Sequence, residues 1–381
     1  MLAIFQQDQQ TGSRQLMDAL TNARKLPRAW IVAVLSATLP IMLTGCGETV
    51  KSPSAFTTVP PPQLPNGVIK LSVVHVVNPR FDKFSDAQLE VFLDSLREAG
   101  KVHFDRRIEF HPIETVSIEE YFKLVPGDVY GWRKTLIYDF KKGKGDRAKL
   151  EAAYETAIRH QAAPAKEWAA YAAREIDLEK VDTDVAEWKK RFADTHIRRL
   201  ESLKTIMAAD GKPALDESPF NEWLYWNMVG ERPQTHDIII TNQLVASAEY
   251  QGVDIHSALR GGVTVGTTEF STQSQFGTQF WWSTFPFTST SPVIVKMRGG
   301  EMYEPLEAAR LAGTGAAHEL GHQLFHYGHP FGISACLMSP TPMLRFREHI
   351  GKLDPEACAA SQSPAMKRGV LKTLRPKYAS D

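Results

Sequence analysis

A five-residue motif late in the chain restricts the local fold more than any other feature of the sequence. Residues 318 to 322 read His-Glu-Leu-Gly-His and lie in a stretch of helical pattern. On a helix, side chains four residues apart share one face, so one zinc ion can bridge the imidazoles of His318 and His322. The motif therefore predicts a helix that carries two ligands of a Zn²⁺ ion. Glu319 then projects beside the metal, where it can act as the general base that accepts a proton from zinc-bound water.

The helix around this motif is expected to run from Tyr303 to about Tyr327. Gly313 and Gly315 weaken its pattern and are consistent with a later start. Gly328 is expected to end the helix, because glycine readily adopts the left-handed conformation that follows many helix ends.

A catalytic zinc site has three protein ligands and one open position, so a third ligand is needed. His329 is the first choice, because it lies seven residues after His322 and just past Gly328, where the chain can turn back towards the metal. His326 is the rival at i+4 from His322, although a straight helix would carry it too far along the axis to share the ion. Glu348 is a further alternative, because gluzincins take a glutamate ligand from a following helix.

The segment from His318 to Pro340 resembles the metzincin zinc peptidases, whose pattern is H-E-x-x-H-x-x-G-x-x-H followed by a methionine turn. Residues 336–340, Cys-Leu-Met-Ser-Pro, are similar to that turn, and their short distance from His329 is most like archaemetzincins. Two features depart from the family pattern: Phe325 stands where the family has glycine, and His329 comes one residue late. The cysteines that hold a second zinc in archaemetzincins are missing, so one metal is expected.

The resemblance implies an α+β zincin domain with a twisted mixed sheet, a backing helix and an active-site helix. It places Met338 as a hydrophobic floor beneath the metal. It also implies a zinc metalloendopeptidase that acts on protein or peptide substrates. The competing interpretation is a catalytically inactive zincin-fold protein with a binding or structural role. Neither the cleavage specificity nor the oligomeric state follows from the sequence.

The first 46 residues are expected to be an export signal. Three basic residues precede an apolar run from Ala29 to Leu43, which is short for a transmembrane helix. The run ends in Leu-Thr-Gly-Cys, which resembles the lipobox of bacterial lipoproteins, so Cys46 is the expected lipidation site. Gly47 then favours the outer membrane of a Gram-negative cell envelope, with the protein facing the periplasm. An uncleaved N-terminal anchor is the alternative.

The charge balance indicates which partners to expect. Lys plus Arg and Asp plus Glu both total 44, which gives no electrostatic argument for binding nucleic acid or an anionic membrane surface. Membrane association is therefore expected through the lipid anchor.

Residues 47–66 are rich in Pro, Ser and Thr and should form an extended tether, followed by the metallopeptidase domain at 67–381.

This domain is expected to begin with a β-α-β unit, which is compatible with the α+β fold that the resemblance implies but is too common to confirm it. A helix is expected from an N-cap at Ser85 to Ala99, with Gly100 as its stop. Strands are expected at Ile69–Val77, Ile108–Val116, Asp237–Thr241 and Gly262–Phe270.

Two long segments have unusual compositions. Residues 147–209 are rich in Ala, Glu, Lys and Arg and predict a helical insertion whose aromatic residues, including Trp168, Tyr171, Trp188 and Phe192, form packing surface. The run from Ser271 to Val295 has aromatic residues and no charge, and is expected to be a core-facing loop or a substrate wall.

Two cysteines remain after the lipidated one, Cys336 and Cys358. In an oxidising compartment they can form a disulfide, and the alternative is a free buried pair.

Overall fold

The computed structural model describes residues 57–59, 62–125, 138–139, 144–159, 185–247, 262–271, 273–330, 333–358 and 371–373. All of them belong to the unit Phe56–Asp381. The expected export signal and Cys46 lie outside the described residues.

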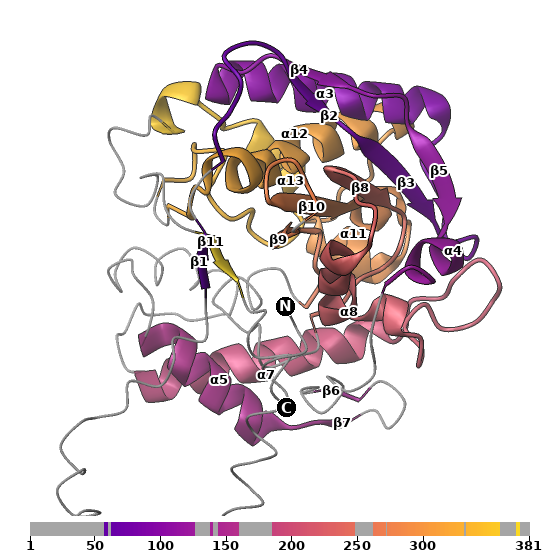
Figure 1. Ribbon diagram of the computed structural model, residues 1–381. Coiled ribbons are helices and arrows are strands. Elements are labelled where there is room, and N and C mark those ends of the chain that lie inside the picture. The colour runs from indigo at the N-terminus through magenta and orange to yellow at the C-terminus, as the bar shows by residue number, and fades with distance from the viewer. Residues whose placement is uncertain are drawn as a thin grey trace, which may run out of the picture. The chain divides into compact units, whose positions relative to one another are not determined.

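A five-stranded mixed sheet organises this unit, in the order β5-β3-β8-β10-β9 (Figure 1). The strands are β3 (Val73–Val77), β5 (Glu114–Ser117), β8 (Ile238–Thr241), β9 (Gly266–Phe270) and β10 (Thr278–Ser283). Four of them pair in parallel, whereas β9 pairs antiparallel with β10 at one edge. The α+β class with a mixed sheet is thus confirmed.

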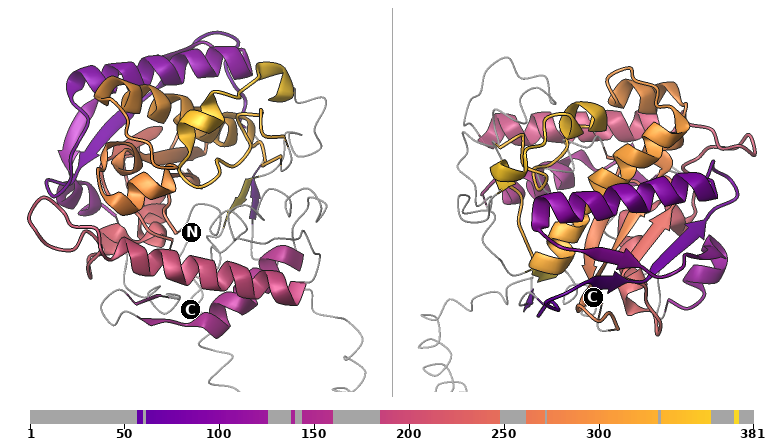
Figure 2. Two further views of the ribbon diagram at one scale, coloured as in Figure 1. Left: turned by 180° about the vertical axis from the view of Figure 1, so that it is seen from behind. Right: turned by 90° about the horizontal axis from the view of Figure 1, so that it is seen from above.

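Two long helices lie on one face of this sheet and pack against each other, α3 (Asp86–Phe104) and α12 (Pro305–Phe325) (Figures 1 and 2). Ser85 caps α3 with a capping box, as its sequence predicts. Gly100 was expected to end α3, but the helix continues to Phe104. Its missing side chain instead admits Ile108, whose Cδ1 would lie 2.6 Å from a Cβ at this position.

The glycines of α12 likewise serve packing rather than a helix start. A Cβ at Gly313 would lie 2.2 Å from the backbone oxygen of Phe92 in α3, and one at Gly315 would contact Phe346. The helix begins at Pro305, close to the expected Tyr303, and the alternative of a later start is wrong, because packing requires both glycines inside a continuous helix.

The opposite face of the sheet is covered by α4 (Ile118–Phe122) and α8 (Trp223–Asn227). Their aromatic side chains share a buried cluster with Val74, Ile239 and Trp281 from the sheet. Both faces of β10 are thus buried, and all six of its residues are inaccessible. The uncharged segment from Ser271 therefore faces the core, as one of the two expectations had it, but it is built around a strand rather than a loop.

Helices α5 (Arg147–Arg159) and α7 (Val185–Leu203) form the described part of the helical insertion. Tyr154 and His196 join them, with Tyr154 Oη 2.9 Å from His196 Nδ1, and His196 Nε2 lies 2.7 Å from the backbone oxygen of Ser247. Burial lowers the pKa of His196 to about 4. Trp188 and Phe192 are buried here, whereas Trp168 and Tyr171 lie outside the described residues.

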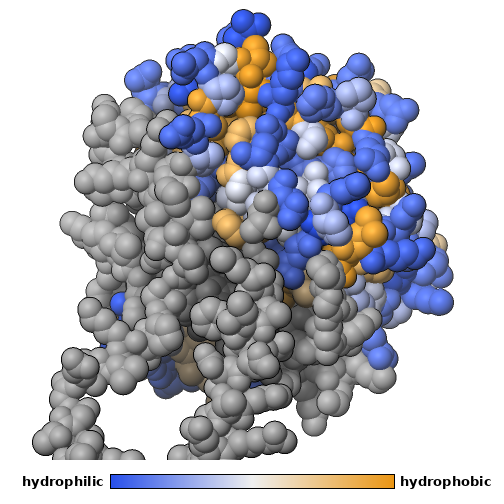
Figure 3. Space-filling view, viewed as in Figure 1, coloured by the Kyte–Doolittle hydropathy of each residue, from blue (hydrophilic) through white to orange (hydrophobic). Residues whose placement is uncertain are grey.

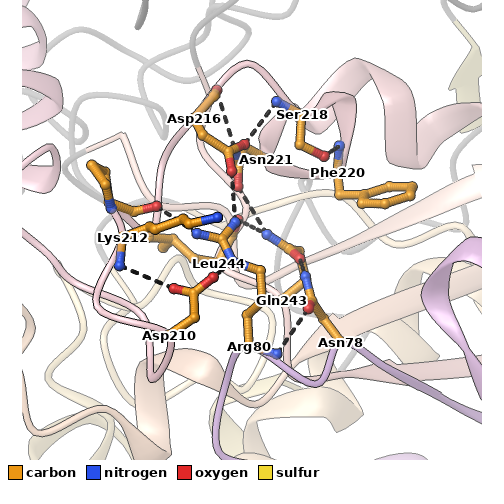
Figure 4. A network of polar contacts seen from close by, with 11 residues as sticks. Asn78, Arg80, Asp210, Lys212, Asp216, Ser218, Phe220, Asn221, Gln243 and Leu244 are labelled. Carbon is orange, nitrogen blue, oxygen red and sulfur yellow. Dashed lines mark hydrogen bonds and ion pairs between the residues drawn. The ribbon is translucent and has the colours of Figure 1, made fainter.

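A polar network fixes the chain after the insertion to the sheet (Figure 4). Arg80, just beyond β3, bonds Asp210 at 2.9 Å and Asp216 at 2.6 Å. Asn78 donates to Gln243 beyond β8 at 2.6 Å. The carboxyl ends of parallel strands often hold ligands, and here this network lies at the ends of β3 and β8.

Shorter elements complete the described structure. The strand pairs are β2 (Ile69–Leu71) with β4 (Ile108–Phe110), β6 (Tyr138–Asp139) with β7 (Lys144–Gly145), and β1 (Thr57–Val59) with β11 (Leu371–Thr373). The helices are α10 (Phe285–Thr288), α11 (Pro292–Met297), α13 (Phe346–Ile350), η2 (Pro219–Asn221), η3 (Met228–Glu231) and η4 (Pro355–Cys358). The strands expected at Ile69–Val77 and Ile108–Val116 are each divided in two, because their first halves pair with each other and their second halves join the main sheet.

The described surface is of mixed polarity. Figure 3 shows hydrophobic residues scattered among hydrophilic ones on the face in view. Among the described residues, no helix is both long and apolar enough to cross a membrane.

Candidate metal centre

Helix α12 carries the predicted motif and ends just after it. The last helical residue is Phe325, and His326 adopts a left-handed conformation with φ of 54°. Its N–H bonds the carbonyls of Gly321 and His322, which caps the helix. The prediction that α12 runs to Tyr327 and stops at Gly328 is therefore wrong by two residues. Histidine is among the non-glycine residues that tolerate this conformation best.

The turn at His326 brings three imidazoles together. His318 Nε2 lies 3.0 Å from His322 Nε2, and His329 Nε2 lies 2.9 Å from each of them. Nitrogens bound to a tetrahedral zinc ion are roughly 3.3 Å apart, for Zn–N bonds of about 2.0 Å. Among the described residues, this is the one group of three or more His, Cys, Asp or Glu side chains that can share a metal ion.

Backbone carbonyls fix the protonation of two of these rings. His318 Nδ1 lies 2.9 Å from the backbone oxygen of Leu337, and His322 Nδ1 makes a short hydrogen bond to that of Tyr327. A carbonyl only accepts, so both Nδ1 atoms donate and both Nε2 atoms of the neutral rings present lone pairs. Two lone pairs facing each other repel unless a cation lies between them. The donor set therefore fits a metal such as Zn²⁺, which prefers neutral imidazole.

Met338 lies directly beneath the motif. A Cβ at Gly321 would fall 2.2 Å from Met338 Sδ and 2.9 Å from its Cε. Met338 is fully buried, as is Leu337, whose carbonyl orients His318. The turn that contains these residues thus supports the histidine cluster in two ways, by packing and by a hydrogen bond.

Substitution of Gly321 tests this packing. Helix propensity alone predicts that Gly321→Ala stabilises α12 by about 1 kcal/mol. We expect the opposite sign, a loss of about 1–3 kcal/mol in the free energy of unfolding, because the added methyl collides with Met338. Denaturant titration of the metal-free protein measures it. In the double variant Gly321→Ala/Met338→Ala the Gly321→Ala penalty should largely disappear, and additive losses would contradict the contact.

Glu319 lies beside the histidines and is held by the edge strand. Its side chain is buried, and Thr268 Oγ1 in β9 donates to its Oε2 at 2.9 Å. The same hydroxyl lies 3.1 Å from the backbone oxygen of Glu319. Thr268 was missed by the sequence analysis, because nothing in its local sequence distinguishes it from other strand threonines.

The next residue of β9, Glu269, faces the other side of the sheet. Its carboxylate oxygen accepts from Trp281 Nε1 at 3.1 Å. Burial raises the pKa of Glu269 well above its usual value, and the nearby charges of Glu231 and Glu319 add to this. Glu269 thus adds less negative charge behind Glu319 than an exposed glutamate would.

The two rival third ligands do not join the histidines. His326 is the buried cap residue of α12, and its Nε2 is not part of the group. Glu348 lies on α13, where it pairs with Lys352 at 2.8 Å and Arg345 at 3.4 Å.

The cysteine of the turn is disulfide-bonded. Cys336 is buried and forms a disulfide. The side chain of Cys358 lies outside the described residues, so its pairing with Cys336 stays a prediction.

Comparisons with protein-family models, with curated proteins and with solved structures give no match. The metzincin resemblance therefore rests on the residues from His318 to Pro340.

Proposed function

We propose that this protein is a zinc-dependent metallopeptidase that hydrolyses peptide bonds in the cell envelope. His318, His322 and His329 hold the Zn²⁺ ion, and Glu319 is the general base. The convergence of three Nε2 atoms within 3.0 Å of one another carries this proposal. Two of these nitrogens are set as lone-pair donors by backbone carbonyls, which a merely structural histidine cluster would not require.

Zn²⁺ bound by the three imidazoles would lower the pKa of a water molecule and polarise a substrate carbonyl. Glu319 takes one proton from the attacking water and delivers it to the departing amine nitrogen, while the remaining hydroxyl joins the carbonyl carbon. The Thr268 hydroxyl orients the carboxylate for this transfer. His318 and His322 stay protonated at Nδ1 throughout, and each Nδ1–H group donates a hydrogen bond to a backbone oxygen.

The edge strand favours an extended peptide as substrate. In the sheet of the described residues, β9 is the last strand and has β10 on one side only. An edge strand can bind an extended chain through backbone hydrogen bonds. Because Thr268 of β9 contacts Glu319, a peptide on this edge would run past the general base.

The displaced turn offers an explanation for the departures from the metzincin pattern. In the family pattern the glycine precedes the third histidine by three residues. Here the turn residue is His326 instead of residue 325, and the third histidine is His329. The whole turn is shifted by one residue while its internal spacing is kept. Met338 beneath Gly321 further supports the proposal of a metzincin-like fold.

The location is proposed from the N-terminal sequence. An export signal ending at Cys46 would attach the protein to a membrane by a lipid, on the periplasmic side of an outer membrane. Envelope proteins and peptides are then the accessible substrates, and nucleic acid is not an expected partner.

Metal removal tests the proposed function. The detergent-solubilised full chain should retain about one zinc per chain after dialysis and cleave an unfolded protein such as reduced, alkylated albumin. Phenanthroline should abolish cleavage, and added Zn²⁺ should restore it. Zinc retention without cleavage of a broad panel of unfolded proteins and peptides would instead favour the binding role. A chain that retains no metal would refute the proposed centre.

A further inference from the structure

A disulfide constrains the turn that supports the proposed metal centre. Leu337 of this turn accepts the hydrogen bond from His318 Nδ1 at 2.9 Å. Met338 packs beneath Gly321, between the two histidines of the motif. Both residues directly follow Cys336, which is disulfide-bonded. The covalent bond is therefore one residue from the carbonyl that orients a metal ligand.

Hydrogen bonds and the packing of buried side chains hold the rest of this turn. The backbone N–H of Cys336 donates to Ile333 at 3.0 Å, and Ser339 N–H donates to Cys336 at 3.0 Å. The Ser339 hydroxyl contacts the backbone oxygen of Pro330 at 2.8 Å, beside His329. Without the covalent constraint, the turn would depend on such bonds, each of which contributes only about 1 kcal/mol, and on the packing of Leu337 and Met338.

The backbone points to the second cysteine of the disulfide. The chain has three cysteines, so the partner of Cys336 is Cys46 or Cys358. The N–H of Asp354 donates to the backbone oxygen of Ala335 at 2.9 Å, which sets this residue beside the start of the turn. Helix η4, Pro355–Cys358, follows immediately.

We propose that a disulfide between Cys336 and Cys358 positions the metal ligand His318, and that the metal affinity of this protein therefore depends on its redox state. The inference rests on the metal centre of the proposed function. Cys336 acts through Leu337 and Met338 rather than on the metal, so it is a positioning residue. In the oxidised protein the Leu337 carbonyl stays in place to orient His318, and in the reduced protein it is released.

The reductive step can be written with a phosphine as the reductant. The phosphine attacks one sulfur and the S–S bond breaks. Water supplies two protons to the two sulfurs and its oxygen to phosphorus, so that two thiols and one phosphine oxide result. The phosphine supplies the two electrons, and no metal redox change is involved.

Zinc affinity in the two redox states tests the proposal. The full chain is reduced with a phosphine, which is then removed under nitrogen, and zinc is titrated against a chromophoric chelator. We expect the zinc Kd of the reduced wild type to rise about 10–100-fold, the range found when a partner that orients a metal-binding histidine is lost. Cys336→Ser and Cys358→Ser should show the same rise without reductant. The visible spectrum of the Co²⁺-loaded protein should change alongside, because it reports the ligand geometry.

Two controls separate this effect from general unfolding and from failure of the metal centre. Cys46→Ser should leave the zinc Kd unchanged, and circular dichroism should show that reduced wild type remains folded at the titration temperature. An equal Kd and Co²⁺ spectrum in both redox states would overturn the proposal, as would a rise caused by Cys46→Ser. If the oxidised wild type binds no zinc, the metal centre itself fails, which is a distinct result.

Discussion

Replacement of His329 by alanine should weaken zinc binding by a few hundredfold. Zinc sites with four protein ligands are worth about 10–16 kcal/mol, so one ligand contributes about 2.5–4 kcal/mol, and each 1.4 kcal/mol is tenfold in Kd. His329 Nε2 lies 2.9 Å from each of the other two ligand nitrogens, so its loss leaves only the two histidines of α12. Competition with a chromophoric chelator measures the change.

The matched control for this prediction is His326→Asn. Residue 326 has φ of 54°, and asparagine tolerates this conformation, so the end of α12 should be preserved. We expect the zinc Kd of this variant to match the wild type within experimental error. If His326→Asn weakens zinc binding and His329→Ala does not, then His326 is the ligand and the chain must turn before it.

The sequence predicts those parts of the centre that depend on local spacing. His318 and His322 share a helix face because four residues make about one turn, and Ser85 caps α3 because its capping partner lies three residues on. Local rules also favour a turn before His329. They assign it to Gly328, since glycine has the lowest cost in a left-handed conformation, whereas the structure uses His326.

The sequence does not predict contacts that depend on the packing of distant elements. Gly100 and Gly313 have the appearance of helix breakers, yet each lies inside a helix where a neighbouring element leaves no room for a Cβ. Thr268 reaches Glu319 only because antiparallel pairing sets β9 at the edge next to α12, across 51 residues of sequence. Such positions are determined by tertiary structure, which overrides local preference.

Composition was misleading in the uncharged segment that contains β10. Serine, threonine and glutamine among aromatic residues suggest a loop, but in β10 one threonine and one serine have buried hydrogen-bond partners. Thr278 Oγ1 donates to the backbone oxygen of Gln323 at 3.0 Å, and Ser283 Oγ donates to that of Gln243 at 2.6 Å. A polar side chain is compatible with a core strand when the fold supplies its hydrogen bond, and the sequence alone does not show this.

Replacement of Glu319 by glutamine should abolish most hydrolysis and leave zinc binding intact. The amide keeps the shape of the side chain and can still accept the Thr268 hydrogen bond, but it does not take a proton from water. General-base catalysis contributes about 10²–10⁴-fold, so kcat/KM should fall by about this factor. Zinc content and cleavage of reduced, alkylated albumin, measured on the same preparation, test both halves of the prediction.

Glu269→Gln is the control for this substitution. Glu269 is the neighbouring buried glutamate of β9, and because burial raises its pKa, glutamine resembles its protonated form. It faces the other side of the sheet, where it accepts from Trp281, so kcat/KM should change little. Full activity in Glu319→Gln would refute the proposed role of Glu319. A role as general base predicts a loss of kcat/KM for Glu319→Gln only. An equal loss of kcat/KM in both variants would show instead that activity is sensitive to the removal of either buried carboxylate.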